Sequence, residues 1–237
     1  MSVGRAWILV WSLLAVAGTA VTQGPGASQS SPSSSSKHMK GSSARLAGDV
    51  DAGTIANGVY RNRSLGLSCK VPAGWVLRTE EMNARDEDSD SGTPSAEEKS
   101  SPQRAQKSTE ADRGGRVLLA AFSRPPDARG EDVNASIVIA AEKVATYPGL
   151  KEAAQYFGPL TEVAKAQGLT ADEDPYEIQV GTRVVVRGDF HKDVGTRVMR
   201  QSTLAFLAQG YAVSITMIGG TEDEVEELVD GVGFGAK

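Results

Sequence analysis

Four arginines in the last third of the chain are the residues best suited to bind a partner. Arg183, Arg187, Arg197 and Arg200 fall on two stretches expected to pair as strands, where they could share one exposed face. Clustered guanidiniums suit carboxylates and phosphates because each offers several donors in a planar fork. We therefore predict them as candidate partner-binding residues for a protein or other anionic partner. The alternative is that they solvate the sheet or protect an edge strand.

The second candidate for chemistry is His191, the one histidine of the predicted folded region. A general base needs a nucleophile and an orienting acid within reach. A small extracytoplasmic hydrolase would therefore bring His191 and Asp189 or Asp193 together with Cys69 or a serine. The alternative, a structural or surface histidine, is the interpretation that we favour, so we assign no catalytic residue. Because Cys69 is the only cysteine, it cannot form an internal disulfide.

An acidic stretch offers weak candidates for a metal site. Asp86, Asp88 and Asp90 have the spacing that begins an EF-hand calcium loop, and Glu97 falls at its twelfth position. The sixth position, however, is Ser91 where the motif needs glycine, and no amphipathic helices flank the segment. A solvated acidic insertion is the favoured interpretation. We predict no metal or other cofactor, and keep a calcium-responsive binder as a third hypothesis.

The net charge argues against one class of partner. The chain carries a formal charge of −5 and has no basic stripe with interleaved aromatic residues. Nucleic-acid binding needs such a stripe to neutralise phosphates. We therefore predict no nucleic-acid partner.

Composition divides the chain into an exported leader, a linker and one domain. Residues 1–20 combine Arg5, an apolar run and small residues before Ala20, which is typical of a secretory signal peptide. The apolar run is shorter than the roughly 20 residues that a membrane span needs, although an uncleaved anchor is the alternative. Residues 21–53 are Ser-rich and predict a disordered linker. A single domain is expected over residues 54–237, with a disordered acidic insertion at about 80–115.

Hydrophobic periodicity predicts the elements that must position these side chains. Residues 182–191, 196–207 and 211–218 have the β-branched or alternating pattern of strands, separated by glycine-containing turns. Thr221 and Glu224 form a capping box that begins a C-terminal helix, and residues 149–167 predict another helix, kinked or split at Pro159. Shorter strands are expected at 65–71, 116–123 and 135–141. The fold class is α+β: a central antiparallel sheet of about six to seven strands with helices on its faces.

The opening and the end of this domain resemble one known family. The motif Tyr60-x-Asn62-x-x-Leu65-Gly66-Leu67, followed by residues 71–75 (VPAGW), is similar to the first hairpin of the PsbP-like superfamily. The ending, residues 210–225 (GYAVSITMIGGTEDEV), is similar too. That superfamily includes the extrinsic PsbP protein of photosystem II, a Ran-binding nuclear import factor and many secreted bacterial proteins. The resemblance implies an α/β/α sandwich, but it carries no catalytic residue to this chain.

Together, these patterns favour a binding protein over an enzyme. We predict a secreted or periplasmic, non-enzymatic binding or interaction domain, exported with its signal peptide cleaved near Ala20 and left without a stable membrane span. The hydrolase that uses His191 is the main alternative. Fold and core patterns report packing and not chemistry, so the partner itself has to be sought in the structure.

Overall fold

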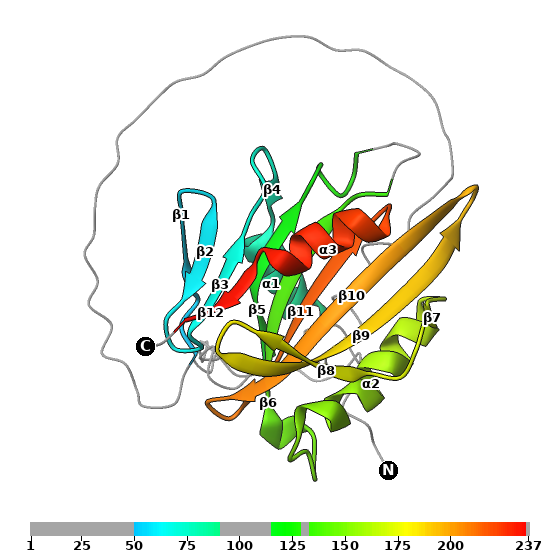
Figure 1. The fold of residues 1–237 in the computed structure, drawn as a ribbon. Helices are drawn as coiled ribbons and strands as arrows, with labels where there is room; N and C mark the ends of the chain where they lie inside the picture. Colours follow the sequence, from blue (N-terminus) through cyan, green and yellow to red (C-terminus); the bar gives the residue numbers. More distant parts are fainter. Residues whose placement is uncertain (1–49, 91–114, 129–132, 236–237) are drawn as a thin grey trace, which may run out of the picture.

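Two antiparallel sheets form the framework of the domain in this computed structural model, which describes residues 50–90, 115–128 and 133–235. One sheet has eight strands and the other four, and three α-helices pack against them (Figure 1). The predicted α+β class with a large antiparallel sheet is confirmed. The central sheet is larger than the six to seven strands expected, and the separate small sheet was not predicted. The signal peptide and nearly all of the predicted linker lie outside the described residues.

The eight-stranded sheet is built around the three long C-terminal strands. Its order is β4 (Val76–Leu77), β5 (Gly115–Phe122), β6 (Ser136–Lys143), β11 (Tyr211–Gly219), β10 (Arg197–Ala208), β9 (Arg183–Val194) and β7 (Thr170–Ala171). A further strand, β8 (Tyr176–Val180), also pairs with β9. Since β7 pairs near His191 and β8 pairs near Arg187, the two short strands follow one another along the same edge.

The small sheet joins the two ends of the domain. Its order is β1 (Thr54–Ala56), β2 (Val59–Asn62), β3 (Leu67–Lys70) and β12 (Val232–Phe234). Packing begins before the predicted domain start, because Val50 is only 1% exposed and belongs to the main core. Asn62 is buried, and its amide donates to the Asp51 carbonyl over 2.7 Å while its Oδ1 accepts from Leu65 N. This amide therefore fixes the start of the domain against the first hairpin.

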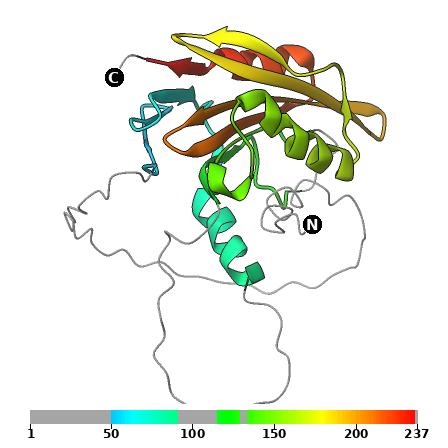
Figure 2. The same ribbon diagram turned by 90° about the horizontal axis from the view of Figure 1, so that it is seen from below.

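The helices lie on opposite faces of the large sheet (Figure 2). Helix α3 (Glu222–Asp230) packs with the small sheet on one face, where Val225 joins Leu204 of β10 in the main core. Helix α2 (Ala153–Ala166) covers the other face, where Phe157 packs with Ala205 of β10. Successive residues of a strand point to opposite faces, so Leu204 and Ala205 identify the two layers. The short 3₁₀ helix Val144–Thr146 follows β6.

Helix α1 (Thr79–Asp90) departs from the sequence prediction, because it occupies the first part of the expected disordered insertion. Long-range contacts explain it. Asn83 donates to the Val117 carbonyl and accepts from Val117 N, both over 2.9 Å, and Thr79 Oγ1 accepts from Ala120 N. Met82 is buried against β5. These contacts hold one side of α1 against β5, and they explain why a sequence with few apolar residues forms a helix here.

Candidate functional site

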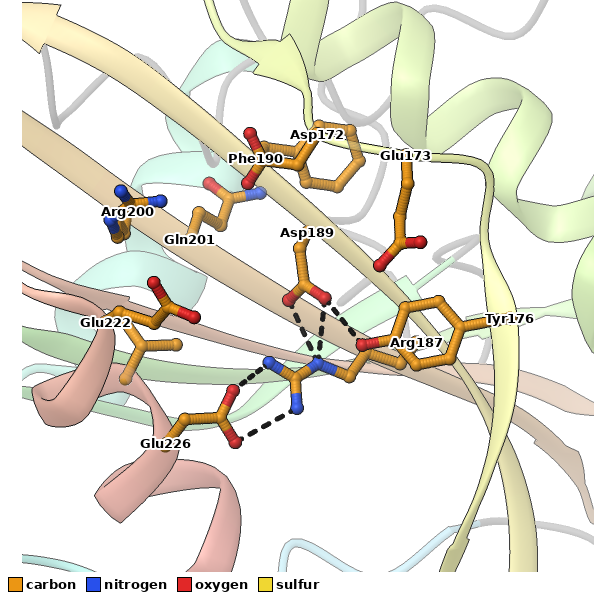
Figure 3. Close-up of a pocket in the computed structure, with 11 residues that line it drawn as sticks. Asp172, Glu173, Tyr176, Arg187, Asp189, Phe190, Arg200, Gln201, Glu222 and Glu226 are labelled. Atoms are coloured by element: carbon orange, nitrogen blue, oxygen red, sulfur yellow. Dashed lines mark hydrogen bonds and ion pairs between the residues drawn. The ribbon is translucent and has the colours of Figure 1, made fainter.

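A cleft opens between the first turns of α3 and the edge of the large sheet formed by β8 and β9 (Figure 3). Its volume is about 320 Å³. The lining residues come from β8, β9, β10, α3 and the loop after β7: Asp172, Glu173, Tyr176, Arg187, Asp189, Phe190, Arg200, Gln201, Glu222, Val225 and Glu226. Strands and a helix, and only one short loop, therefore hold the cleft in shape.

Arg187 is the centre of the cleft's charge network. Its Nε donates to both Asp189 oxygens over 3.0 Å, and its two terminal nitrogens contact the Glu226 carboxylate, one of them over 3.1 Å. The Arg187 side chain is only 12% exposed, against 18% for Asp189 and 45% for Glu226. Burial alone would lower the pKa of Arg187, but the hydrogen bonds to the two carboxylates outweigh it and raise that pKa above its usual range. Arg187 therefore ties α3 to β9 as a fixed cation.

Tyr176 completes this network from β8. Its hydroxyl donates to Asp189 Oδ2 over 2.9 Å. Burial, followed by the hydrogen bond to Asp189 and the charge of Asp189, raises the pKa of Tyr176 to about 12. The tyrosine is therefore a neutral donor at physiological pH, and Asp189 has partners on both oxygens.

Three charged side chains of the cleft are free to meet a ligand. Glu173 on the loop before β8, Glu222 in the first turn of α3, and Arg200 on β10 make no hydrogen bond or ion pair with any described residue. Both glutamates are exposed and Arg200 is half-buried. Five carboxylates and two guanidiniums line the cleft, which gives the lining a formal charge of −3.

His191 lies at the rim, beside the cleft. Its Nδ1 contacts Asp172 Oδ1, and the two side chains are 37% and 34% exposed. No described serine or cysteine makes a hydrogen bond with it. Ser202 faces the same side of the sheet, directly across from Asp189, but it is 0% exposed and its Oγ has no partner among the described residues. An acid–histidine pair is present, but no serine or cysteine among the described residues is hydrogen-bonded to it as a nucleophile.

Cys69, the other predicted nucleophile, lies in the main core, away from the cleft. It is 0% exposed on β3, paired with Tyr60 of β2 and Val232 of β12. Burial raises the pKa of the Cys69 thiol to about 12, so the reactive thiolate is strongly disfavoured.

The structure does not bring the four predicted arginines together. Arg187 and Arg200 line the cleft, whereas Arg183 stacks over Phe206, with its guanidinium carbon 4.7 Å from the ring centroid. Arg200 pairs with His191, eight residues along β9 from Arg183, which corresponds to roughly 26 Å. Arg197 pairs with Val194 and points to the opposite face, because strand residues alternate.

The predicted calcium residues lie at and beyond the edge of a described segment, so the structure does not test them. Asp86, Asp88 and Asp90 fall within the helical backbone of α1, and Glu97 lies outside the described residues. In the part of the chain that the structure describes, no group of three or more His, Cys, Asp or Glu side chains is placed to hold a metal ion.

A buried acid that sequence reasoning missed lies under α2. Glu142 on β6 is 5% exposed and accepts a hydrogen bond from the Tyr147 hydroxyl. Burial raises the pKa of Glu142, although the hydroxyls of Tyr147 and Tyr156 partly oppose the shift. The two tyrosine rings meet edge to face, with centroids 5.3 Å apart. The cluster is enclosed by core residues, so we interpret it as structural.

Comparisons with known proteins leave the family open. No family model matches the chain, and no curated protein matches it. Among solved structures, a protein from Bacteroides thetaiotaomicron is 12% identical with a TM-score of 0.33; the match covers 72% of this chain and 46% of that one. LpqN of Mycobacterium tuberculosis, described as involved in cell envelope biogenesis, is 11% identical with a TM-score of 0.30, covering 52% of this chain and 79% of LpqN. This chain therefore spans less than half of the Bacteroides protein, and the PsbP-like resemblance stays a prediction.

None of the described helices is long and apolar enough to cross a membrane.

Proposed function

We propose that this chain is an exported, non-enzymatic binding module whose protein partner docks at the cleft between α3 and β8–β9. The observation that carries the proposal is the combination of a fixed charge network with free charges beside it. Arg187 is held by Asp189 and Glu226, while the carboxylates of Glu173 and Glu222 lie at the same cleft without an ion pair to any residue that the structure describes.

The rigidity of the site supports binding. Because Arg187 crosslinks α3 to β9, the two walls are held in place before a partner arrives. A preorganised site loses less conformational entropy on association, which leaves more of the contact energy as affinity. Arg200, the one predicted arginine in the cleft without an ion pair to a described residue, can donate to partner oxygens.

Chemistry at His191 has less support. Asp172 could orient the imidazole, but Ser202 and Cys69 are both fully buried, and neither makes a hydrogen bond with His191.

The export part of the proposal rests on residues 1–20, whose charge and apolar run are typical of a signal peptide cleaved near Ala20. The PsbP-like α/β/α arrangement also belongs to the proposal, supported by helices on both faces of the large sheet.

The test is partner capture from the native extracytoplasmic fraction by the full chain carrying a C-terminal tag. The cleft variant Glu173→Gln/Glu222→Gln removes two exposed carboxylates. Its matched control, Glu177→Gln/Glu227→Gln, removes two exposed carboxylates from β8 and α3 that do not line the cleft. We expect a partner that the control retains and the cleft variant loses.

The proposal fails if every captured protein is retained equally by the cleft variant and the control. Hydrolysis of an ester or peptide substrate by the wild-type chain, abolished by His191→Ala, would replace the binding module with the hydrolase alternative.

A further inference from the structure

The edge of the large sheet at β5 is only partly covered by another strand. The outermost strand, β4, pairs with Phe122 and Ala121 of β5 and ends at Leu77. Beyond that point helix α1 packs against β5 in place of a strand. We propose that α1 guards this edge, and that the edge pairs with β5 of a second copy of the chain when α1 detaches.

Hydrogen bonds from the start of α1 imitate those of a neighbouring strand. The Ala120 carbonyl accepts from Arg78 N, and Ala120 N donates to Thr79 Oγ1, both over 2.9 Å. Farther along β5, the Asn83 side-chain amide donates to the Val117 carbonyl and accepts from Val117 N. The N–H and the C=O of both β5 residues are therefore satisfied, as they would be beside a paired strand.

The stretch of β5 that α1 covers is one that would associate if it were open. Residues 117–122 (VLLAAF) are apolar and uncharged, and each is 3% exposed or less. Short segments of this kind at an open sheet edge pair with other strands, and natural sheets protect them with charges, proline or a covering element. Residues 117–122 contain neither a charge nor a proline, so the protection at Val117 and Ala120 comes from α1.

Helix α1 is held by few contacts. Among its described side chains, Met82 is the one that is apolar and buried, whereas α2 buries Tyr156, Phe157 and Ala164. An element with few buried apolar contacts opens at a low free-energy cost relative to the rest of the fold. We therefore expect α1 to detach more easily than α2, while the sheet stays intact.

A second copy fits the open edge because an antiparallel strand edge is complementary to itself. A two-fold axis beside β5 lets each copy donate and accept along the same row of backbone groups. The uncharged side chains of residues 117–122 would bring no like charges together across that axis. This inference is independent of the proposed function, because the cleft lies at the other edge of the sheet, beside β8 and β9.

Sedimentation equilibrium of the purified full chain measures the predicted self-association. Asn83→Leu removes both bonds to Val117 and should increase the population of detached α1 about tenfold. Because the dimer needs two copies with α1 detached, its association constant should rise about a hundredfold over that of the wild type.

Asn134→Leu is the matched control. The Asn134 amide makes the same two bonds with the backbone of Arg124, both over 3.1 Å, and its Oδ1 also accepts from the Ser123 hydroxyl. These bonds lie between the end of β5 and the start of β6, away from the open edge. The control should therefore change the association constant by less than about threefold, since it does not act on α1.

Hydrogen exchange of the Val117 and Ala120 amides, followed by NMR, locates the interface. In monomeric Asn83→Leu these two amides should exchange faster than in the wild type, and they should become protected again at concentrations where the dimer forms. Thr79→Val is a milder variant for use if Asn83→Leu does not fold, because it removes only the acceptor of Ala120 N. It should raise the association constant about tenfold.

Dimerisation of the control to the same extent would overturn the inference, because a general loss of stability would then be the cause. Variants no more dimeric than the wild type would overturn it by showing that the uncovered edge does not pair with itself. A dimer whose Val117 and Ala120 amides exchange as fast as in the monomer would also overturn it, because the copies would then meet through another surface.

Discussion

Replacing Arg187 with methionine should destabilise the domain by about 2–3 kcal/mol. Removing one member of a buried ion pair costs about 3–5 kcal/mol, because the remaining charge is left desolvated. Here Asp189 is 18% exposed, so it bears most of that cost. Glu226 is 45% exposed and would contribute at the level of a surface pair, about 0–1 kcal/mol. Tyr176 still donates to Asp189, which reduces the total further.

Urea denaturation of the full chain, followed by circular dichroism, measures the change. The midpoint should fall while the slope with urea stays constant, since a lower midpoint at constant slope reports stability alone. Arg183→Met is the control, because Arg183 makes ring contacts with Phe206 and Phe234 worth only about 0.5–1 kcal/mol. Adding Asp189→Asn to Arg187→Met should recover roughly half of the loss, because the stranded charge is removed.

A loss for Arg187→Met no larger than that for Arg183→Met would refute the reasoning, since it would show that Asp189 is not paying a desolvation cost. Failure of Asp189→Asn to recover any stability would refute it independently.

Three further predictions concern single buried groups. Ser202→Ala should raise the free energy of unfolding by up to about 1 kcal/mol, because the hydroxyl is buried and unsatisfied; a loss of stability in urea melts would contradict this. Burial raises the pKa of Glu142 above its unfolded value of 4.5, so the folded state holds the proton more firmly. Stability should therefore fall as pH rises from about 4.5 through the raised folded value, and urea melts of Glu142→Gln should lack that slope. Because burial raises the pKa of Cys69 to about 12, its thiol should react with DTNB at neutral pH only in urea; rapid labelling of the native chain would show that the thiol is accessible.

Local sequence patterns predicted the C-terminal unit well. The expected strands at 182–191, 196–207 and 211–218 correspond to β9, β10 and β11. Thr221 is the N-cap of α3, where its Oγ1 accepts from Glu224 N over 3.1 Å, but the capping box is not completed, because the Glu224 carboxylate accepts from Gly220 N. Alternation, turn glycines and caps are properties of neighbouring residues, so a single sequence contains them. The expected helix near 149–167 is α2, which runs from Ala153 to Ala166 without a break at Pro159.

Features that depend on distant contacts could not be predicted in this way. Helix α1 has one buried apolar side chain, Met82, and is fixed by Asn83 and Thr79 to a strand more than 30 residues later. The small sheet pairs Leu67 with Phe234, at the far end of the chain. No local periodicity reports either contact, because each is set by packing between elements.

The cleft is another feature that depends on contacts between distant parts of the sequence. In the sequence, Asp172 and Glu173 form a turn cluster, and Glu222 is part of a helix cap, which are both ordinary local roles. Only the pairing of β8 and β9 and the packing of α3 bring these acids to one cleft with Arg187. Strand alternation by itself puts Arg197 and Arg200, three residues apart, on opposite faces, so the expectation that all four arginines share one face was wrong. What alternation could not show is that Arg187 would be neutralised by Asp189 and Glu226.

Photo-crosslinking tests the central claim, that a partner docks at the cleft, most directly. A photoreactive phenylalanine would replace Glu173 in the cleft or, as the matched control, Glu177 on β8, in the full chain expressed in its native host. We expect a discrete crosslinked protein at position 173 but not at position 177, lost when the cells are illuminated in high salt. The same crosslinks at both positions, or none at position 173 while the chain is folded, would contradict the proposed binding site.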